Sequence, residues 1–357
     1  MTATRHASRT EGQDAVNTVS SDCTSAFLAT TLRKRLKAVL RPIPGIRNGR
    51  DIECIHDLRV ASRRLFCTLK VLADFFPKHF FKRWRKPLRR LTRTMGAARD
   101  ADVQIEFLKN SLKDVNDRHC RPGVRRLLLR LTQQREAMQS KVLRELDRFD
   151  KAGITEALDF ALRQKQVRTR LLPRQDVVSP KRLYQAAFHC LTTLLEDMLV
   201  YEIQVMDPRC MSELHRMRIA ARRLRYAIEV FAPLYPDRLE AAYNLLTEIQ
   251  EMLGEIHDCD LWIEFLPTFL KAEQTRARDY CGRANAVNRL KPGLDDLAST
   301  CRKRRKTRYR DFIALWQTVQ KQKFWEIFCR NLQRPLRSIR RTPGPKNNRS
   351  PAPDSQT

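Results

Sequence analysis

Two stretches of this sequence carry apolar residues at the spacing of a helix that buries one face. Intervals of three and four residues place such a set on one side of an α-helix. The apolar positions are Leu58, Ala61, Leu65, Leu69, Leu72 and Phe76 in the first stretch, and Met217, Ala220, Leu224, Ile228, Phe231 and Tyr235 in the second. The pattern predicts two helices that each face a core.

The same periodicity predicts four helices on either side of the chain's midpoint. In the first half they lie near residues 22–41, 51–74, 78–95 running on into 99–115, and 120–150. In the second half they lie near 180–205, 210–233, 237–253 with 257–272, and 284–330. Residues 166–180 read as a linker, and the polar residues 1–20 and the proline-rich, basic residues 332–357 read as disordered tails.

The two halves repeat each other. Residues 56–77 align without a gap on residues 215–236, and 9 of 22 positions are identical. A second block, residues 96–108, matches residues 254–266 at 7 of 13 positions. A tandem duplication explains this, with halves of about 21–165 and 180–331. The simplest architecture is all-α: two four-helix bundles related by a pseudo-two-fold axis.

The face opposite each apolar stripe is basic. In the first repeat it carries His56, Arg59, Arg63 and Lys70, flanked by Arg64; in the second it carries His215, Arg218, Arg222 and Arg225, flanked by Arg223. A merely solvated helix usually interleaves acids four residues away, whereas Arg59/Arg63 and Arg218/Arg222 are like charges at that spacing and weaken the helix. A solvated face remains the alternative, but we favour an anion site.

The composition supports a polyanionic partner. The 357 residues hold 70 Lys and Arg against 40 Asp and Glu, a formal net charge of +30. Rows of guanidinium forks suit a chain of phosphates, because each fork makes bidentate hydrogen bonds to phosphate oxygens. Nearby phosphates also raise the pKa of histidine, so binding is expected to strengthen at mildly acidic pH.

The third helix of each half breaks the symmetry. Residues 82–93 carry seven cations and no acid, with Lys82, Lys86, Arg89 and Arg93 on one face, whereas residues 241–252 carry two glutamates and no cation. The positive potential should therefore be stronger over the first half. A further basic run at residues 302–306, which includes Arg305, either closes the anion site or is an ordinary exposed face.

Paired aspartates follow Gly96 and Gly254. Asp100, Asp102, Asp258 and Asp260 could hold a divalent cation with His257. We favour the alternative, in which one aspartate of each pair caps the following helix and the other holds an arginine of the basic face. We therefore expect no metal site and no cofactor.

The blocks His56 to Leu65 and His215 to Leu224 (H-x-x-R-V/I-A-x-R-R-L), with the G-x-x-x-D-x-D segments at Gly96 and Gly254, resemble the conserved histidine α-helical domain family, CHAD. The resemblance covers roughly residues 20–330. It implies two four-helix bundles around a basic central cavity that binds inorganic polyphosphate, often at polyphosphate granules. Carried over by position, the binding residues are His56, Arg59, Arg63, Arg64, His215, Arg218, Arg222 and Arg223. The β-rich triphosphate-tunnel domain that many relatives carry at the N-terminus has no match here, which predicts a stand-alone form.

The sequence thus predicts a polyphosphate-binding protein that is not an enzyme. Two alternatives stay open: a nonspecific nucleic-acid-binding protein, since any phosphate chain releases counterions, and a metal-dependent phosphohydrolase. The polar N-terminus has no apolar signal region, and no window holds 18 uninterrupted apolar residues. We therefore expect a cytoplasmic protein, on granules where these form, with no membrane partner.

Overall fold

All the regular structure in the described part of the chain is helical. The computed structural model describes residues 26–49, 53–76, 78–115, 117–158, 160 and 180–341. Every regular element in these ranges is a helix or a helical turn, which confirms the all-α prediction. None of these helices combines the length and apolar character needed to cross a bilayer. The predicted tail 1–20 and residues 166–179 of the predicted linker lie outside the described ranges.

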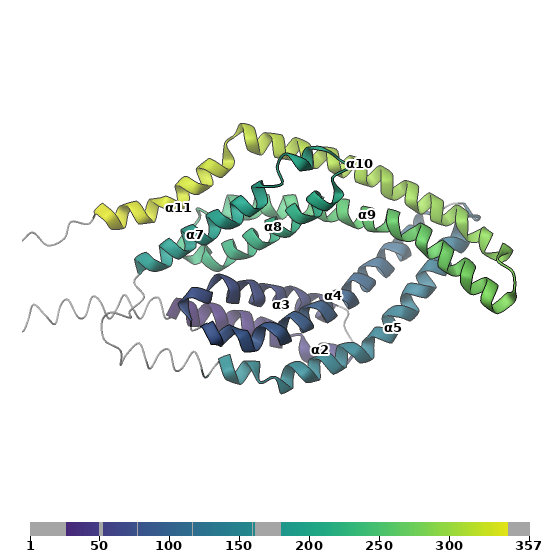
Figure 1. Cartoon of the computed structure of the whole chain (residues 1–357), viewed down its shortest axis with the longest axis horizontal. Coiled ribbons are helices and arrows are strands. Elements are labelled where there is room, and N and C mark those ends of the chain that lie inside the picture. The colour runs from purple at the N-terminus through teal and green to yellow at the C-terminus, as the bar shows by residue number, and fades with distance from the viewer. Residues whose placement is uncertain are drawn as a thin grey trace, which may run out of the picture.

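The two halves present their helices in the same order (Figure 1). The first half has a helix over residues 26–40, then α2 (Ile43–Arg47), α3 (Glu53–Val71), α4 (Lys78–Asp114) and α5 (Arg121–Lys151). The second half has α7 (Pro180–Leu199), α8 (Met211–Phe231), α9 (Glu240–Cys281), α10 (Lys291–Lys321) and α11 (Phe324–Arg341). Both α3 and α8 end in a short 3₁₀ turn, Ala73–Phe75 and Ala232–Leu234.

Helices α4 and α9 run without a break through Gly96 and Gly254, where the sequence predicted turns. Buried side chains keep helical spacing on both sides of each glycine: Met95, Ala98 and Ala101 in α4, and Leu253, Ile256 and Cys259 in α9. Packing of this face offsets the cost of a helical glycine, about 1 kcal/mol relative to alanine. No new helix begins there, so the prediction that an aspartate caps one is wrong.

The C-terminal region differs from the prediction in two ways. The single helix predicted over 284–330 is interrupted at Lys323, whose φ of 50° ends α10 and lets α11 begin. Helix α11 then packs on α7 and buries Phe328 and Leu332. The predicted disorder of 332–357 is therefore wrong for residues 332–341, because an apolar period that begins at Trp325 continues through Leu332. Residues 342–357 lie outside the described ranges.

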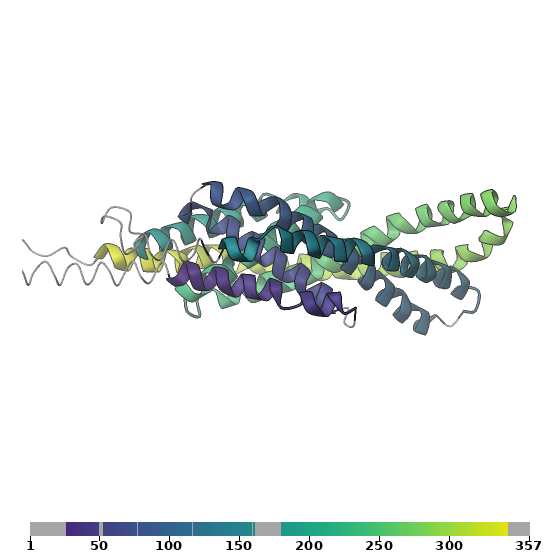
Figure 2. The same cartoon turned by 90° about the horizontal axis from the view of Figure 1, so that it is seen from below.

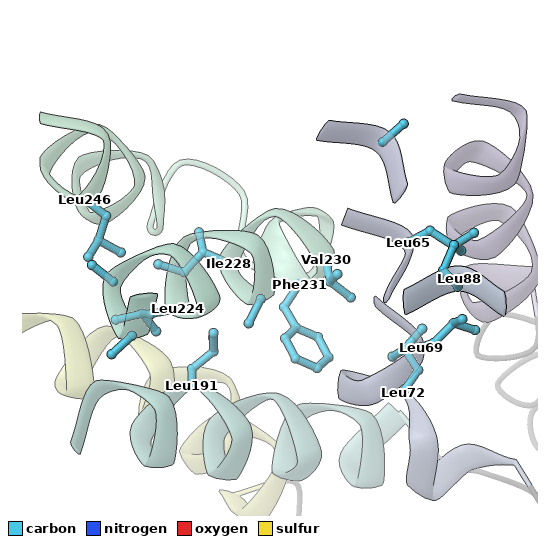
Figure 3. Close-up of a cluster of buried hydrophobic side chains, with 14 of the residues drawn as sticks. Leu65, Leu69, Leu72, Leu88, Leu191, Leu224, Ile228, Val230, Phe231 and Leu246 are labelled. Carbon is cyan, nitrogen blue, oxygen red and sulfur yellow. The ribbon is translucent and has the colours of Figure 1, made fainter. Parts of the chain in front are cut away.

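One hydrophobic core runs through both halves. Figure 3 shows leucines of α3 and α4 on one side and side chains of α7, α8 and α9 on the other. All twelve residues of the two predicted apolar stripes are buried. The stripes of α3 and α8 face this core, and side chains from their other faces meet at the boundary between the halves, where Arg64 contacts Glu229 and Cys67 contacts the carbonyl of Arg223.

A second core forms at the far end of the elongated molecule, where the α4–α5 and α9–α10 hairpins meet (Figures 1 and 2). It includes Leu108, Leu127, Trp262 and Leu294. The first turns of α5 and α10 cross there with almost no space between their backbones. A Cβ on Gly123 would overlap the carbonyl oxygen of Leu290, and one on Gly293 would overlap that of Cys120. Glycine at both positions permits this crossing.

We expect Gly123→Ala and Gly293→Ala each to lower the free energy of unfolding by about 1–3 kcal/mol, because the added methyl group meets backbone that cannot rotate away. Urea unfolding followed by circular dichroism measures this. Gly96→Ala is the matched control, since a Cβ there would lie 3.8 Å from Nε of Arg59 and meet nothing closer. A similar loss in all three variants would contradict the close crossing.

Candidate anion-binding site

Helices α3 and α8 pack against each other and bring the two predicted basic faces together. Arg59 lies close enough to Arg218 to lower its pKa, and Arg222 has the same effect on Arg63. Arginines that correspond in the two repeats therefore lie within range of each other's charge. We call Arg59, Arg63, Arg218 and Arg222 the arginine cluster.

The cluster holds more positive charge than its surroundings neutralise. Burial, together with the charges of Arg59 and Arg222, lowers the pKa of Arg63 to about 10. Burial is also the main cause of the lowered pKa values of Arg218 and Arg222. Among the described residues, Arg59 is the only member of the cluster that forms an ion pair, with Asp100. A guanidinium with a pKa of about 10 is still protonated at neutral pH, so a bound anion would relieve an existing repulsion around Arg63.

The Gly and Asp positions that both repeats share lie at one end of the cluster. The guanidinium of Arg59 lies over Gly96 and donates to Asp100 at 3.0 Å, and the guanidinium of Arg218 lies 3.5 Å from where a Cβ of Gly254 would be. Asp258 acts on Arg218 through its charge. The expected pairing of one aspartate with a basic-face arginine is thus observed for Arg59.

The second aspartate of each pair serves another contact. Asp102 accepts a hydrogen bond from Arg135 of α5 at 2.7 Å. Asp260 pairs with Arg305 of α10, whose guanidinium also donates to the carbonyl of Pro208 at 2.8 Å. Arg305 was predicted to bind the anion, but its donors already hold α10 to α9 and to the loop before α8. It is not part of the arginine cluster.

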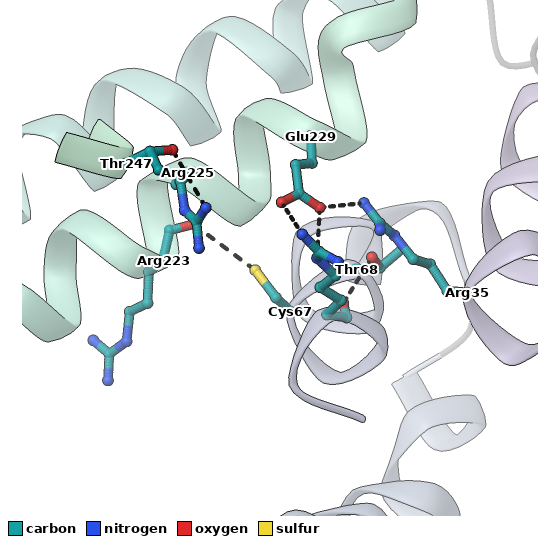
Figure 4. Close-up of polar contacts among 8 residues, drawn as sticks. Arg35, Cys67, Thr68, Arg223, Arg225, Glu229 and Thr247 are labelled. Carbon is teal, nitrogen blue, oxygen red and sulfur yellow. Dashed lines mark hydrogen bonds and ion pairs between the residues drawn. The ribbon is translucent and has the colours of Figure 1, made fainter. Parts of the chain in front are cut away.

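Glu229 follows Arg222 two turns later on α8 and joins α8 to α3 and to the first helix (Figure 4). Its carboxylate, 13% exposed, accepts a hydrogen bond from Arg64 of α3 and one from Arg35 of the first helix, each at 3.0 Å. Arg64, predicted to bind the anion, therefore also ties the two halves together. Lys70 and Arg223 are exposed, and the charge of Arg223 helps lower the pKa of Arg222.

Tyr226 of α8 was not identified from the sequence. Its ring is buried, with the guanidinium of Arg64 5.8 Å and that of Arg225 5.4 Å from its centroid. Arg225 also lies over the ring of Tyr243, and it donates to Thr247 at 3.3 Å. These contacts fix two of the predicted arginines by cation–π attraction. The sequence signal was its position, since Tyr226 replaces Cys67 of the first repeat on the face between the halves.

Two histidines of the second half, His215 and His257, lie beside the arginine cluster. The rings of His215 and His257 lie 4.1 Å apart between centroids. Burial is the main cause of a lowered pKa for both, and the charges of His215, Arg218 and Arg222 help bring the pKa of His257 to about 4. Both rings are therefore neutral at pH 7. His56 is half-buried at the corresponding place in α3, and its Nδ1 has no hydrogen-bond partner among the described residues.

The four cations predicted on one face of α4 are all exposed. Lys82, Lys86, Arg89 and Arg93 form no ion pair with another described residue, whereas Arg90 beside them pairs with the buried Glu145. Trp84 is 2% exposed and belongs to the core. The unpaired charge thus gathers on the solvent side of the helix.

A cavity of about 360 Å³ lies beside the site rather than in it. Lys34, Arg35, Glu229, Tyr235 and Tyr243 contribute to its lining, and none of the predicted anion-binding residues does. The basic central cavity therefore stays a prediction. Within the described ranges, no three His, Cys, Asp or Glu side chains gather where they could share a metal ion.

Comparisons with known proteins identify a family and a fold. The model of the CHAD domain family matches residues 30–267. The crystal structure of the CHAD domain from the plant Ricinus communis is similar at a TM-score of 0.60 and 21% identity, over 82% of this chain and 91% of that one. PptA from Streptomyces chartreusis aligns at a TM-score of 0.49 and 18% identity, over 82% of this chain and 99% of that one. No curated protein matches. At such identities the Ricinus structure supports the fold alone.

We expect Glu229→Gln to lower the free energy of unfolding by about 1–3 kcal/mol, because Arg35 and Arg64 lose the carboxylate that compensates them in a half-buried place. Added sulfate should restore more stability to this variant than to the parent, since the ion can take the carboxylate's place. Thermal unfolding with and without sulfate tests both statements. Asp207→Asn, which breaks the exposed pair with Arg209, is the control and should change stability little.

Proposed function

This chain belongs to the CHAD domain family, and from that premise and the arginine cluster we propose that it binds inorganic polyphosphate without hydrolysing it. The observation that carries the proposal is the in-register arrangement of Arg59, Arg63, Arg218 and Arg222 with a shortage of carboxylates around them. Two rows of guanidinium groups suit a ligand whose charge repeats along its length.

The energetic argument favours a phosphate chain over a single carboxylate metabolite. Burial already disfavours the charged forms of Arg63, Arg218 and Arg222, so each negative charge placed among them removes repulsion as well as adding attraction. One small anion would reach only part of the cluster. A chain of linked phosphates supplies several charges but loses the translational entropy of only one molecule, whereas several separate anions would each lose it.

The non-catalytic part of the proposal rests on the residues around the cluster. Hydrolysis needs a group that activates water, such as a free carboxylate or an imidazole that accepts a proton near neutral pH. Asp100 is committed to Arg59, Asp258 lies within range of the charge of Arg218, and the pKa of His257, about 4, leaves that ring a weak base. We extend the proposal to association with polyphosphate granules in the cytoplasm, where long chains of this ligand would be concentrated.

The proposal predicts that the double variant Arg63→Glu with Arg222→Glu loses polyphosphate binding by at least a hundredfold while keeping its helical circular dichroism spectrum. The control reverses two exposed cations at the far end of α9, Lys271→Glu with Arg278→Glu, and changes the net charge equally. Its affinity should fall only slightly. Competition against single-stranded and duplex nucleic acid at matched charge and salt completes the test.

Comparable affinity for polyphosphate and both nucleic acids would favour the nonspecific nucleic-acid binder instead. Release of orthophosphate that depends on a divalent metal and is lost in His56→Ala would favour the phosphohydrolase. Unchanged polyphosphate affinity in the Arg63/Arg222 variant would contradict the site itself.

Binding should also tighten as the pH falls. His215 and His257 are neutral in the free protein at pH 7, and nearby phosphates raise their pKa values, so binding takes up protons below the new values. We expect affinity to rise about tenfold from pH 7 to pH 5 and to be flat above pH 7. Titration calorimetry in two buffers of different ionisation enthalpy counts the protons. His257→Gln should reduce the uptake, and His119→Gln, on the exposed loop between α4 and α5, should not.

A further inference from the structure

Carboxylates stand at both ends of the arginine cluster. Asp100, 63% exposed, and the exposed Asp258 lie at the end formed by Arg59 and Arg218. Glu229 lies at the other end, held by Arg35 and Arg64. At either end these carboxylates occupy neighbouring arginines, so a polyanion that continues along α3 and α8 meets cations whose charge is already compensated. A longer chain gains most by extending sideways to cations that no carboxylate compensates, over α4 or over α9.

The two sides differ sharply in charge. On α4, Lys82, Lys86, Arg89 and Arg93 are exposed and form no ion pair with a described residue. The corresponding residues of α9, one repeat later, are Ala241, Leu245, Glu248 and Met252. Glu248 and the nearby Glu251 are exposed and would repel a phosphate chain. The charge distribution leaves α4 as the favourable side.

The α4 cations continue from the cluster without a gap. Gly96 of α4 lies against the cluster, since its Cβ would be 3.8 Å from Nε of Arg59 and 4.0 Å from a terminal nitrogen of Arg63. At about 100° per residue, Arg89, Arg93 and Lys82 project within about 60° of Gly96 around the helix. The face from Arg93 to Lys82 extends about 16 Å along α4.

We propose that this α4 face is a second binding segment that only long polyphosphate chains reach, so that the protein discriminates polyphosphate by chain length. The inference rests on the proposed function. A short chain fills the arginine cluster and gains nothing from α4. A long chain engages both segments at once. Because the second contact is intramolecular, it costs less entropy than the binding of a second molecule.

The two segments should also differ in their response to salt. The α4 cations are fully in contact with solvent, so their attraction is screened by added ions, whereas the half-buried arginine cluster is screened less. Each phosphate contact that releases a counterion adds about 0.7 to the slope of log affinity against log salt for a single-stranded polyanion. Four contacts on α4 would contribute about 3.

The test compares inorganic tripolyphosphate with a long-chain polyphosphate as probes. In the full chain, Lys82, Lys86, Arg89 and Arg93 are all changed to Gln, which keeps helix propensity while removing four charges. The control changes Arg302, Lys303, Lys306 and Arg310 to Gln, four exposed cations of α10 that form no ion pair with a described residue. Circular dichroism confirms that both variants fold, and affinities are measured from about 50 to 300 mM salt.

We expect the α4 variant to bind the long chain at least tenfold more weakly, with a salt slope reduced by about 3, and to bind tripolyphosphate within twofold of the parent. The α10 control should lose much less affinity for the long chain. Equal losses in the two variants, or a parallel loss for both probes, would overturn the length inference while leaving polyphosphate binding in place. Failure of the parent protein to bind either probe would overturn the proposed function, and this inference with it.

Discussion

The structure depends on holding two like-charged helix faces against each other. Helices α3 and α8 bury apolar stripes in the core, and that burial, worth about 25 cal/mol for each Å² of apolar surface removed from water, fixes the direction in which their opposite faces point. Those faces carry arginines that lower one another's pKa. The repulsion cannot be relieved by rotating either helix, because rotation would expose Leu65 or Leu224. The apolar core therefore maintains the excess of positive charge.

Contacts outside the cluster also help to hold the two like-charged halves together. Glu229 joins the halves through Arg35 and Arg64, so one carboxylate offsets part of the charge where the helices continue past the site. At the far end, Gly123 and Gly293 let the hairpins cross closely enough to form a second core. Tyr226 holds Arg64 and Arg225 by its ring, without adding a negative charge that would compete with a ligand. Each contact stabilises the pair of halves while leaving Arg63 and Arg222 unpaired among the described residues.

The parts of this arrangement that follow a local period could be predicted from the sequence. The stripes of α3 and α8 and their basic faces depend on residues three and four apart, and all twelve stripe positions are buried. Contacts between distant segments could not be predicted in this way. Glu229 pairs with Arg35, which lies 194 residues away in the sequence, and Arg305 pairs with Asp260. Gly96 and Gly254 read as turns, yet both lie inside continuous helices, because the neighbouring positions on the same face are buried against other helices. The apolar period of α11 was missed because the predicted disordered tail was taken to begin at residue 332, within that period.

The repeat explains why charge accumulates at this boundary rather than elsewhere. When two copies of a helix with one basic face pack through that face, corresponding arginines come within range of each other's charge, as the effect of Arg222 on the pKa of Arg63 indicates. In a single copy the same basic face would be exposed, and water and ions would screen the repulsion between its arginines. Divergence then acts unequally on the two copies: Glu229 replaces Lys70 and supplies the carboxylate between the halves, while α9 carries Glu248 where α4 carries Arg89. A symmetric pair would repel along its whole length. With these substitutions, the unpaired charge lies in the cluster and on the α4 side but not on the α9 side. The site is therefore asymmetric although the two repeats are related.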